Sequence, residues 1–224
     1  MMKYITKGYC IILPILLIVF FAACNNTTNV HNKQGIPENS KTVQVHLVDS
    51  LGMIGLSVPI SYDTSFSWIH YSDCGKPCDE QKYRFQPKTL SIVKETGWYS
   101  KESLTDPINR LTISHSSFIR LQGGTMRTDS IRHKHLMEQL TSDPVNPPII
   151  FDTMQEINDR YYSIIVMEKS DTLFSKKILA STTIKNNVVK FQYELLTKKN
   201  DSITDSFIKN SIKLIKTIRI SKGI

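Results

Sequence analysis

The chain has 224 residues, and its 28 lysines and arginines outnumber its 20 aspartates and glutamates, which gives a net charge of +8. A chain of this length forms about one ordinary domain. The basic residues are spread out and are not interleaved with aromatic residues, a pattern that argues against binding to nucleic acid.

The start of the chain has the pattern of a secretory signal. Lys3 and Lys7 give it a positive start, residues 10–21 are mostly apolar, and residues 22–24 read Ala-Ala-Cys. This segment resembles the lipobox of bacterial lipoproteins, which implies removal of residues 1–23 and lipid chains such as palmitate on the Cys24 sulfur. An uncleaved anchor is disfavoured, because the apolar run is about half of the roughly 20 residues that a membrane span needs.

Residues 24–42 are predicted to form a lipidated, flexible tether, since they are mostly polar and bury too little surface to fold. In lipoproteins of Gram-negative bacteria, an Asp just after the lipid-bearing Cys commonly marks retention at the inner membrane. Asn25 stands there instead, so the resemblance implies the outer membrane. Some Bacteroidota lipoproteins reach the cell surface through an acidic run at this point. None follows Cys24, so the periplasmic face is expected.

Two cysteines, Cys74 and Cys78, remain in the predicted mature domain. Outside the cytoplasm such a pair is expected to be oxidised, and the glycine and proline between them favour a turn that brings the sulfurs together. A structural disulfide is the leading interpretation. The alternative is a redox or metal site that recruits His70 and Asp73, although the spacing matches neither the thioredoxin motif nor a standard zinc pattern.

Alternating or continuous apolar residues predict strands along most of the domain. Asparagine tolerates positive φ, so Asn158-Asp159 and Asn186-Asn187 are predicted to be hairpin turns. The expected strands are residues 43–48, 54–60, 66–71, 83–85, 90–93, 110–115, 149–156, 160–169, 176–184, 188–197 and 217–220.

Helical spacing of apolar residues appears in two places. The first helix is predicted to start after a cap at Asp129 or Ser130 and to end near Ser142. The second is predicted to start at Ser202, which forms a capping-box variant with Asp205. One apolar stripe follows this second helix, made of Ile203, Phe207, Ile208, Ser211, Ile212 and Ile215.

Runs of strands with two to three helices predict one α+β domain over residues 43–221, with a largely antiparallel sheet. The order of strands and capped helix in residues 160–220 resembles the PsbP-like fold of photosystem II extrinsic subunits and their Ran-binding relatives. Residues 56–59 and 66–68 are placed like the first strands of that fold. This resemblance implies an α/β/α sandwich and an accessory or docking role. The chain is also similar to small lipoproteins of Bacteroidota.

No residue is assigned to catalysis, a cofactor or a metal. Ser114 and His115 combine a nucleophile and a base, but neighbouring residues of a strand point to opposite faces. His133 and His135 lie on different faces of the first predicted helix, so both are expected at the surface. Four aromatic residues are expected in the core or, as an alternative, along a ligand groove: Trp68, Tyr71, Trp98 and Tyr99.

The leading hypothesis for function is a membrane-anchored, non-catalytic module that binds an envelope protein or another partner through its sheet face or the cysteine loop. The runner-up is an envelope thiol or metal enzyme centred on Cys74, Cys78 and His70. A third hypothesis, a carrier of a small molecule or lipid, requires an apolar cavity of several hundred Å³.

Overall fold

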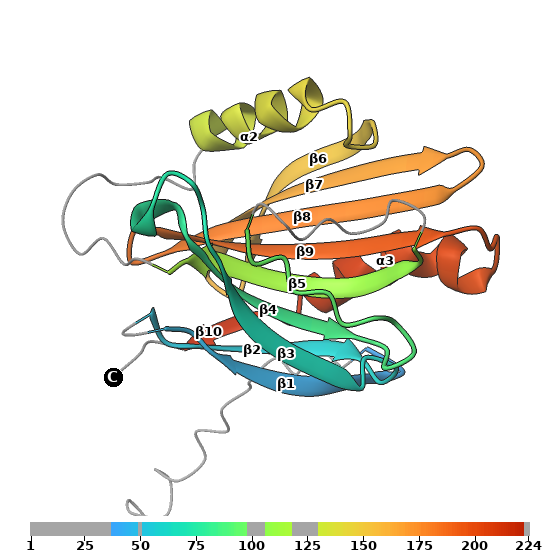
Figure 1. Ribbon diagram of the computed structural model, residues 1–224, viewed down its shortest axis with the longest axis horizontal. Coiled ribbons are helices and arrows are strands. Elements are labelled where there is room, and N and C mark those ends of the chain that lie inside the picture. Colours follow the sequence, from blue (N-terminus) through green and yellow to red (C-terminus); the bar gives the residue numbers. More distant parts are fainter. Residues whose placement is uncertain (1–36, 49–50, 98–105, 118–129, 222–224) are drawn as a thin grey trace, which may run out of the picture. The chain divides into compact units, whose positions relative to one another are not determined.

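Antiparallel strands make up most of the computed structural model, which describes residues 37–48, 51–97, 106–117 and 130–221 (Figure 1). Cys24 and residues 1–36 lie outside these ranges. The described elements are β1 (Ser40–His46), β2 (Met53–Pro59), β3 (Thr64–His70), the short 3-10 helix η2 (Lys76–Cys78), β4 (Glu80–Gln86), β5 (Ile108–Ser116), α2 (Ser130–Ser142), β6 (Ile149–Ile157), β7 (Arg160–Ser170), β8 (Phe174–Ile184), β9 (Asn187–Thr197), α3 (Ser202–Ile215) and β10 (Arg219–Ser221).

The strands form two sheets. The larger sheet has seven strands in the order β3-β4-β5-β9-β8-β7-β6, and the smaller has three in the order β1-β2-β10. Every described pair is antiparallel. The antiparallel pairing predicted from the sequence is therefore confirmed.

The main core lies between one face of the large sheet, the small sheet and α3. Inward side chains alternate along β9, as the two-residue period of a strand requires, with Val189, Phe191 and Tyr193 all buried. Leu56 from β2 and Leu214 from α3 join the same apolar cluster. A smaller cluster on the opposite face packs Leu136, Met137 and Leu140 of α2 on Ile165, Met167 and Leu179.

The predicted α+β class, with two to three helices packed in an α/β/α sandwich, is wrong. The described chain is mostly β, with ten strands and two α-helices. No residue of α2 is buried, and this helix covers only the part of the sheet around Ile165, Met167 and Leu179. The other face of the large sheet, which forms the main core, is covered by α3 and the small sheet together. Strand-forming segments therefore occupy much of the space that a helical layer was expected to fill.

Residues 90–93 do not form the predicted strand, because side chains take up their backbone carbonyl groups. Gln86 Nε2 donates to the carbonyl oxygens of Leu90 and Ser91, both at 3.1 Å. Arg84 Nη1 donates to the carbonyl oxygen of Val93 at 3.0 Å. This segment crosses the strands as an extended loop and is not paired as another strand.

The two predicted hairpin turns differ in accuracy. Asn158 and Asp159 have φ values of 47° and 63°, and they connect β6 and β7 as expected. The β8–β9 turn is formed by Lys185 and Asn186, with φ values of 44° and 64°. Asn187 already pairs with Ile184, so the predicted turn at Asn186-Asn187 was one residue too late.

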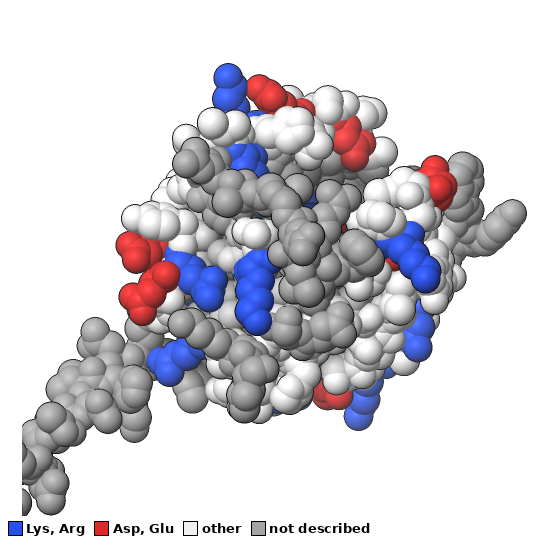
Figure 2. Space-filling model, turned by 90° about the vertical axis from the view of Figure 1, so that its left-hand side faces the viewer, with Lys and Arg blue, Asp and Glu red and all other residues white. Residues whose placement is uncertain are grey.

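The first strand begins at Ser40, inside the segment expected to be a tether. Residues 36–224 cluster as one compact unit. Neither α2 nor α3, the helices of the described ranges, is long and apolar enough to cross a bilayer. On the face drawn in Figure 2, basic and acidic side chains are interspersed among uncharged ones.

Candidate functional site

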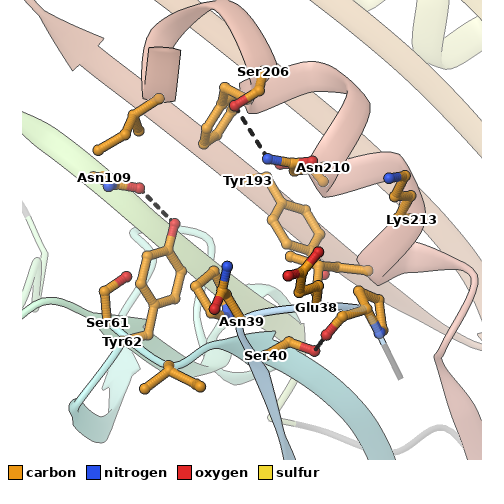
Figure 3. Close-up of a pocket in the computed structure, with 17 residues that line it drawn as sticks. Glu38, Asn39, Ser40, Ser61, Tyr62, Asn109, Tyr193, Ser206, Asn210 and Lys213 are labelled. Atoms are coloured by element: carbon orange, nitrogen blue, oxygen red, sulfur yellow. Dashed lines mark hydrogen bonds between the residues drawn. The ribbon is translucent and has the colours of Figure 1, made fainter. Parts of the chain in front are cut away.

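A pocket of about 510 Å³ opens where the described part of β1 begins, beside α3 (Figure 3). Five separate parts of the chain line it: the β1 start, the β2–β3 connection, β5, β9 and α3. Its residues are Pro37, Glu38, Asn39, Ser40, Pro59, Ile60, Ser61, Tyr62, Asn109, Tyr193, Ile203, Ser206, Phe207, Asn210, Ser211, Lys213 and Leu214.

Two backbone hydrogen bonds fix the wall formed by the β1 start and the β2 end. Ile60 N donates to the carbonyl oxygen of Asn39 at 2.9 Å, and Tyr62 N donates to that of Pro59 at 2.9 Å. Asn39 has a φ of 59°, a left-handed conformation that asparagine adopts more readily than most residues. These contacts turn the chain so that Tyr62 points inward and Ile60 stays at the surface.

Asp201 positions the opposite wall by capping α3. Its Oδ1 accepts hydrogen bonds from the backbone N–H groups of Ile203 at 3.1 Å and Thr204 at 3.0 Å. The predicted cap at Ser202 is therefore wrong by one residue. These hydrogen bonds, led by that from Thr204 N, lower the pKa of the Asp201 carboxyl. The cap sets where the helix starts and so aims Ile203 and Phe207 at the pocket.

The inner end of the pocket carries two phenols and one amide. Tyr62 Oη donates to Asn109 Oδ1 at 2.6 Å. The Tyr193 hydroxyl is buried and has no hydrogen-bond partner within the described ranges. Figure 3 shows the Tyr193 ring between α3 and the segment of Glu38 and Ser40. The inner end therefore presents polar groups that carry no charge.

Burial keeps both phenols neutral. It raises the pKa of Tyr62 and of Tyr193 well above the ordinary value of a tyrosine, and the nearby Tyr62 raises that of Tyr193 further. The charged residues of the pocket, Glu38 and Lys213, are exposed at its rim. Both phenols therefore keep their protons at neutral pH.

The rim is partly apolar. Ile60 is 57% exposed and Ile203 is 58% exposed, so both present side chains that a ligand would cover. Asn210 Nδ2 donates to Ser206 Oγ at 3.1 Å along the exposed side of α3. The pocket thus combines an apolar rim with hydrogen-bonding groups at its inner end, as ligand sites commonly do.

The predicted disulfide between Cys74 and Cys78 is present, and the two Cα atoms are 5.9 Å apart. It closes an exposed loop that also holds η2. Asp79 fastens this loop, because its Oδ1 accepts from Ser72 N at 2.8 Å and its carbonyl oxygen accepts from Ser117 N at 2.8 Å.

The structure does not join His70 to the cysteines in a reactive group. Its Nδ1 lies 2.8 Å from the carbonyl oxygen of Glu95, and Trp68 Nε1 donates to the same oxygen at 3.0 Å. Within the described ranges, no group of three or more His, Cys, Asp or Glu side chains is arranged to hold a metal ion. The cysteine loop and the pocket share no residue.

His133 is a residue whose environment the sequence analysis missed. It was expected at the surface, yet its Nδ1 lies 2.6 Å from Ser163 Oγ and its Nε2 lies 2.9 Å from Asp152 Oδ2. Its side chain is 13% exposed, whereas that of His135 is 69% exposed. The three residue types are those of a Ser-His-Asp triad, but the ring nitrogens are exchanged, because in the triad Nε2 faces the serine and Nδ1 faces the aspartate. Ser163 lies within β7 and Asp152 lies in β6, so the two contacts of His133 fasten α2 to the sheet.

The remaining candidates do not converge on one site. Ser114 is paired beside Lys82 and Lys190 on one face of the sheet, whereas His115 stacks on Tyr83 with ring centroids 5.9 Å apart. Trp68 is buried beneath the Arg84 guanidinium, 4.7 Å from its ring centroid.

Tyr71, another of the predicted aromatic residues, does not line the pocket. Tyr71 is 58% exposed, and Trp98 and Tyr99 lie outside the described residues. The pocket residues themselves gave no sequence signal, because they come from five distant segments and match no motif.

Comparison with known proteins gives a likeness of fold to solved structures. No protein-family model and no curated protein matches the sequence. Among solved structures, the chain is similar to the solution structure of cyanobacterial PsbP (CyanoP) from Synechocystis sp. PCC 6803, at 9% identity and a TM-score of 0.48, over 84% of this chain and 96% of that chain. This is the family whose layout the C-terminal segments resemble. The lipoprotein and Bacteroidota resemblances stay predictions.

Proposed function

We propose that this chain is a lipid-anchored, non-catalytic binding module of the bacterial outer membrane, facing the periplasm, and that its pocket holds a small molecule. The observation that carries the proposal is the pocket beside α3, with its uncharged inner end and apolar rim. Its volume of about 510 Å³ falls within the range of small-molecule sites.

The predicted anchor would keep the pocket close to the membrane. Pro37, at the pocket rim, follows Cys24 by 13 residues. A flexible segment of that length has an end-to-end distance of about 20 Å and cannot exceed about 45 Å. The module would therefore sample molecules at the bilayer surface.

The chemistry of the pocket supports binding and not turnover. Tyr62 is engaged by Asn109, and burial keeps both pocket phenols protonated. The hydroxyl of Ser206 accepts from Asn210, and among the described residues neither a histidine nor a cysteine lines the pocket. General acid–base or nucleophilic catalysis requires a group whose pKa lies near the working pH or an activated nucleophile.

Binding is tested with the fluorescent naphthalene ketone prodan, whose emission reports transfer out of water. Asn210 is exposed at the pocket, and Lys209 is exposed next to it but does not line the pocket. We expect the wild type and K209W to bind prodan, and N210W to bind about tenfold more weakly because its side chain fills the opening. Equal titration curves for N210W and K209W would exclude the pocket.

The anchor is tested separately by intact-mass analysis of the native product. We expect a chain that begins at Cys24 and carries fatty acid, and a C24A variant that leaves the membrane fraction. Retention of residues 1–23 without fatty acid would contradict the proposed location, and it would leave the pocket result unaffected.

A further inference from the structure

The Tyr193 hydroxyl is a buried polar group in the wall of the pocket. Tyr193 is 1% exposed, and within the described ranges its Oη has no hydrogen-bond partner. Buried polar groups are nearly always paired, and leaving one unpaired costs free energy. An unpaired hydroxyl in a pocket wall therefore points to a partner that is not part of the chain.

The neighbouring groups define what that partner presents. The Tyr62 hydroxyl hydrogen is already given to Asn109 Oδ1. Asn109 Oδ1 faces Tyr62 in this bond, so the donor Asn109 Nδ2 points away from the Tyr62 hydroxyl. Tyr193 lines the pocket and its hydroxyl hydrogen is not given to the described chain, so this group can donate to an acceptor oxygen.

Charge restricts the ligand further. The charged side chains of the pocket, Glu38 and Lys213, are exposed at its rim, and the inner end holds neutral phenols and an amide. An ionised group placed there would lose its hydration without a counter-ion, at a large cost in free energy. The buried end of the ligand is therefore uncharged.

From these observations, we infer that the pocket recognises an apolar small molecule through one uncharged carbonyl oxygen, as in a ketone, ester or amide, which accepts a hydrogen bond from Tyr193. This inference rests on the proposed binding function and names the ligand class. Ile60 and Ile203 cover the apolar body of the molecule, and Tyr193 selects the carbonyl.

The test compares prodan with 2-(dimethylamino)naphthalene, which has the same ring system without the ketone. The proteins are the wild type, Y193F and the control Y161F, whose tyrosine is 56% exposed on β7 and does not line the pocket. For prodan we expect Y193F to bind about two- to tenfold more weakly, the value of one neutral hydrogen bond. The emission of bound prodan should also shift to the blue in Y193F, because its carbonyl loses a donor.

The ketone-free probe should bind all three proteins equally. If prodan binds Y193F as tightly as the wild type, with unchanged emission, the carbonyl assignment is wrong while the pocket remains a binding site. If neither probe binds the wild type, both the binding function and the ligand class fail.

Discussion

Removing one partner of the ion pair between Arg110 and Glu194, on the polar face of the large sheet, should destabilise the fold. Arg110 Nε donates to Glu194 Oε2 at 2.7 Å, and the side chains are only 9% and 17% exposed. We predict that E194Q is strongly destabilised, because it leaves the buried guanidinium without the opposite charge of Glu194.

Removing one member of a buried pair costs about 3–5 kcal/mol, and the slight exposure of Glu194 favours the lower end. For a domain of this size, a loss of about 3 kcal/mol lowers Tm by about 6–12 °C. Lys88 and Asp63 provide the control, because their charged atoms are 3.9 Å apart and their side chains are 78% and 41% exposed. K88A should lower Tm by at most about 2–4 °C, since exposed pairs contribute about 0–1 kcal/mol.

The same pair predicts a pH dependence. Burial alone would raise the pKa of Glu194, but the charges of Arg110 and Lys177 and hydrogen bonds from Arg110 and Gln192 outweigh it and lower that pKa. The stabilisation is therefore complete above the unfolded value of about 4.3 and is lost as pH falls through the lower folded pKa.

Thermal unfolding followed by circular dichroism, for the wild type, E194Q and K88A, measures both effects. The Tm difference between wild type and E194Q should be largest at pH 6–7 and shrink below about pH 4. An E194Q variant that unfolds within 2 °C of K88A at neutral pH would refute the reasoning.

Three further predictions concern other parts of the chain. Replacing Cys74 and Cys78 by serine should lower the free energy of unfolding by about 2 kcal/mol, because the closed loop is short. A much larger loss in denaturant titration would contradict a disulfide that stabilises only its own loop. H133A should raise the rate of hydrogen exchange in α2 about tenfold, because the contacts of His133 to Ser163 and Asp152 are lost. If H135A raises the exchange rate in α2 as much as H133A does, these contacts do not hold the helix. Y193F should unfold at the same or higher temperature than the wild type, since it removes an unpaired buried hydroxyl; a clear drop in Tm would reveal a structural partner.

Local patterns in the sequence predicted the strands well, because alternation and turn chemistry act within a few residues. Asn158 and Asp159 form the β6–β7 turn as expected. The β8–β9 turn was predicted one residue too late because Lys185 adopts a positive φ, a conformation that lysine does not favour. Residues 90–93 look like a strand, but side chains of β4 take their carbonyl groups.

Long-range packing was harder to predict. The third strand of the small sheet is β10, a three-residue strand that joins β2 from a distant part of the chain, and such pairing leaves no local pattern. His133 looks like a surface residue on a weakly amphipathic helix until β6 and β7 supply Asp152 and Ser163. The pocket is hidden for the same reason, since Asn109 and Tyr193 meet Tyr62 only in the folded chain.

The central claim, that the pocket beside α3 binds a small apolar molecule, is tested most directly by NMR of protein labelled at isoleucine methyl groups during a prodan titration. Ile60 and Ile203 line the pocket, whereas Ile131 is exposed on α2 and Ile165 is buried beneath that helix. The account predicts saturable shifts at Ile60 and Ile203 and none at Ile131 and Ile165. Shifts confined to the α2 side, or no saturable shift at Ile60 and Ile203, would contradict it.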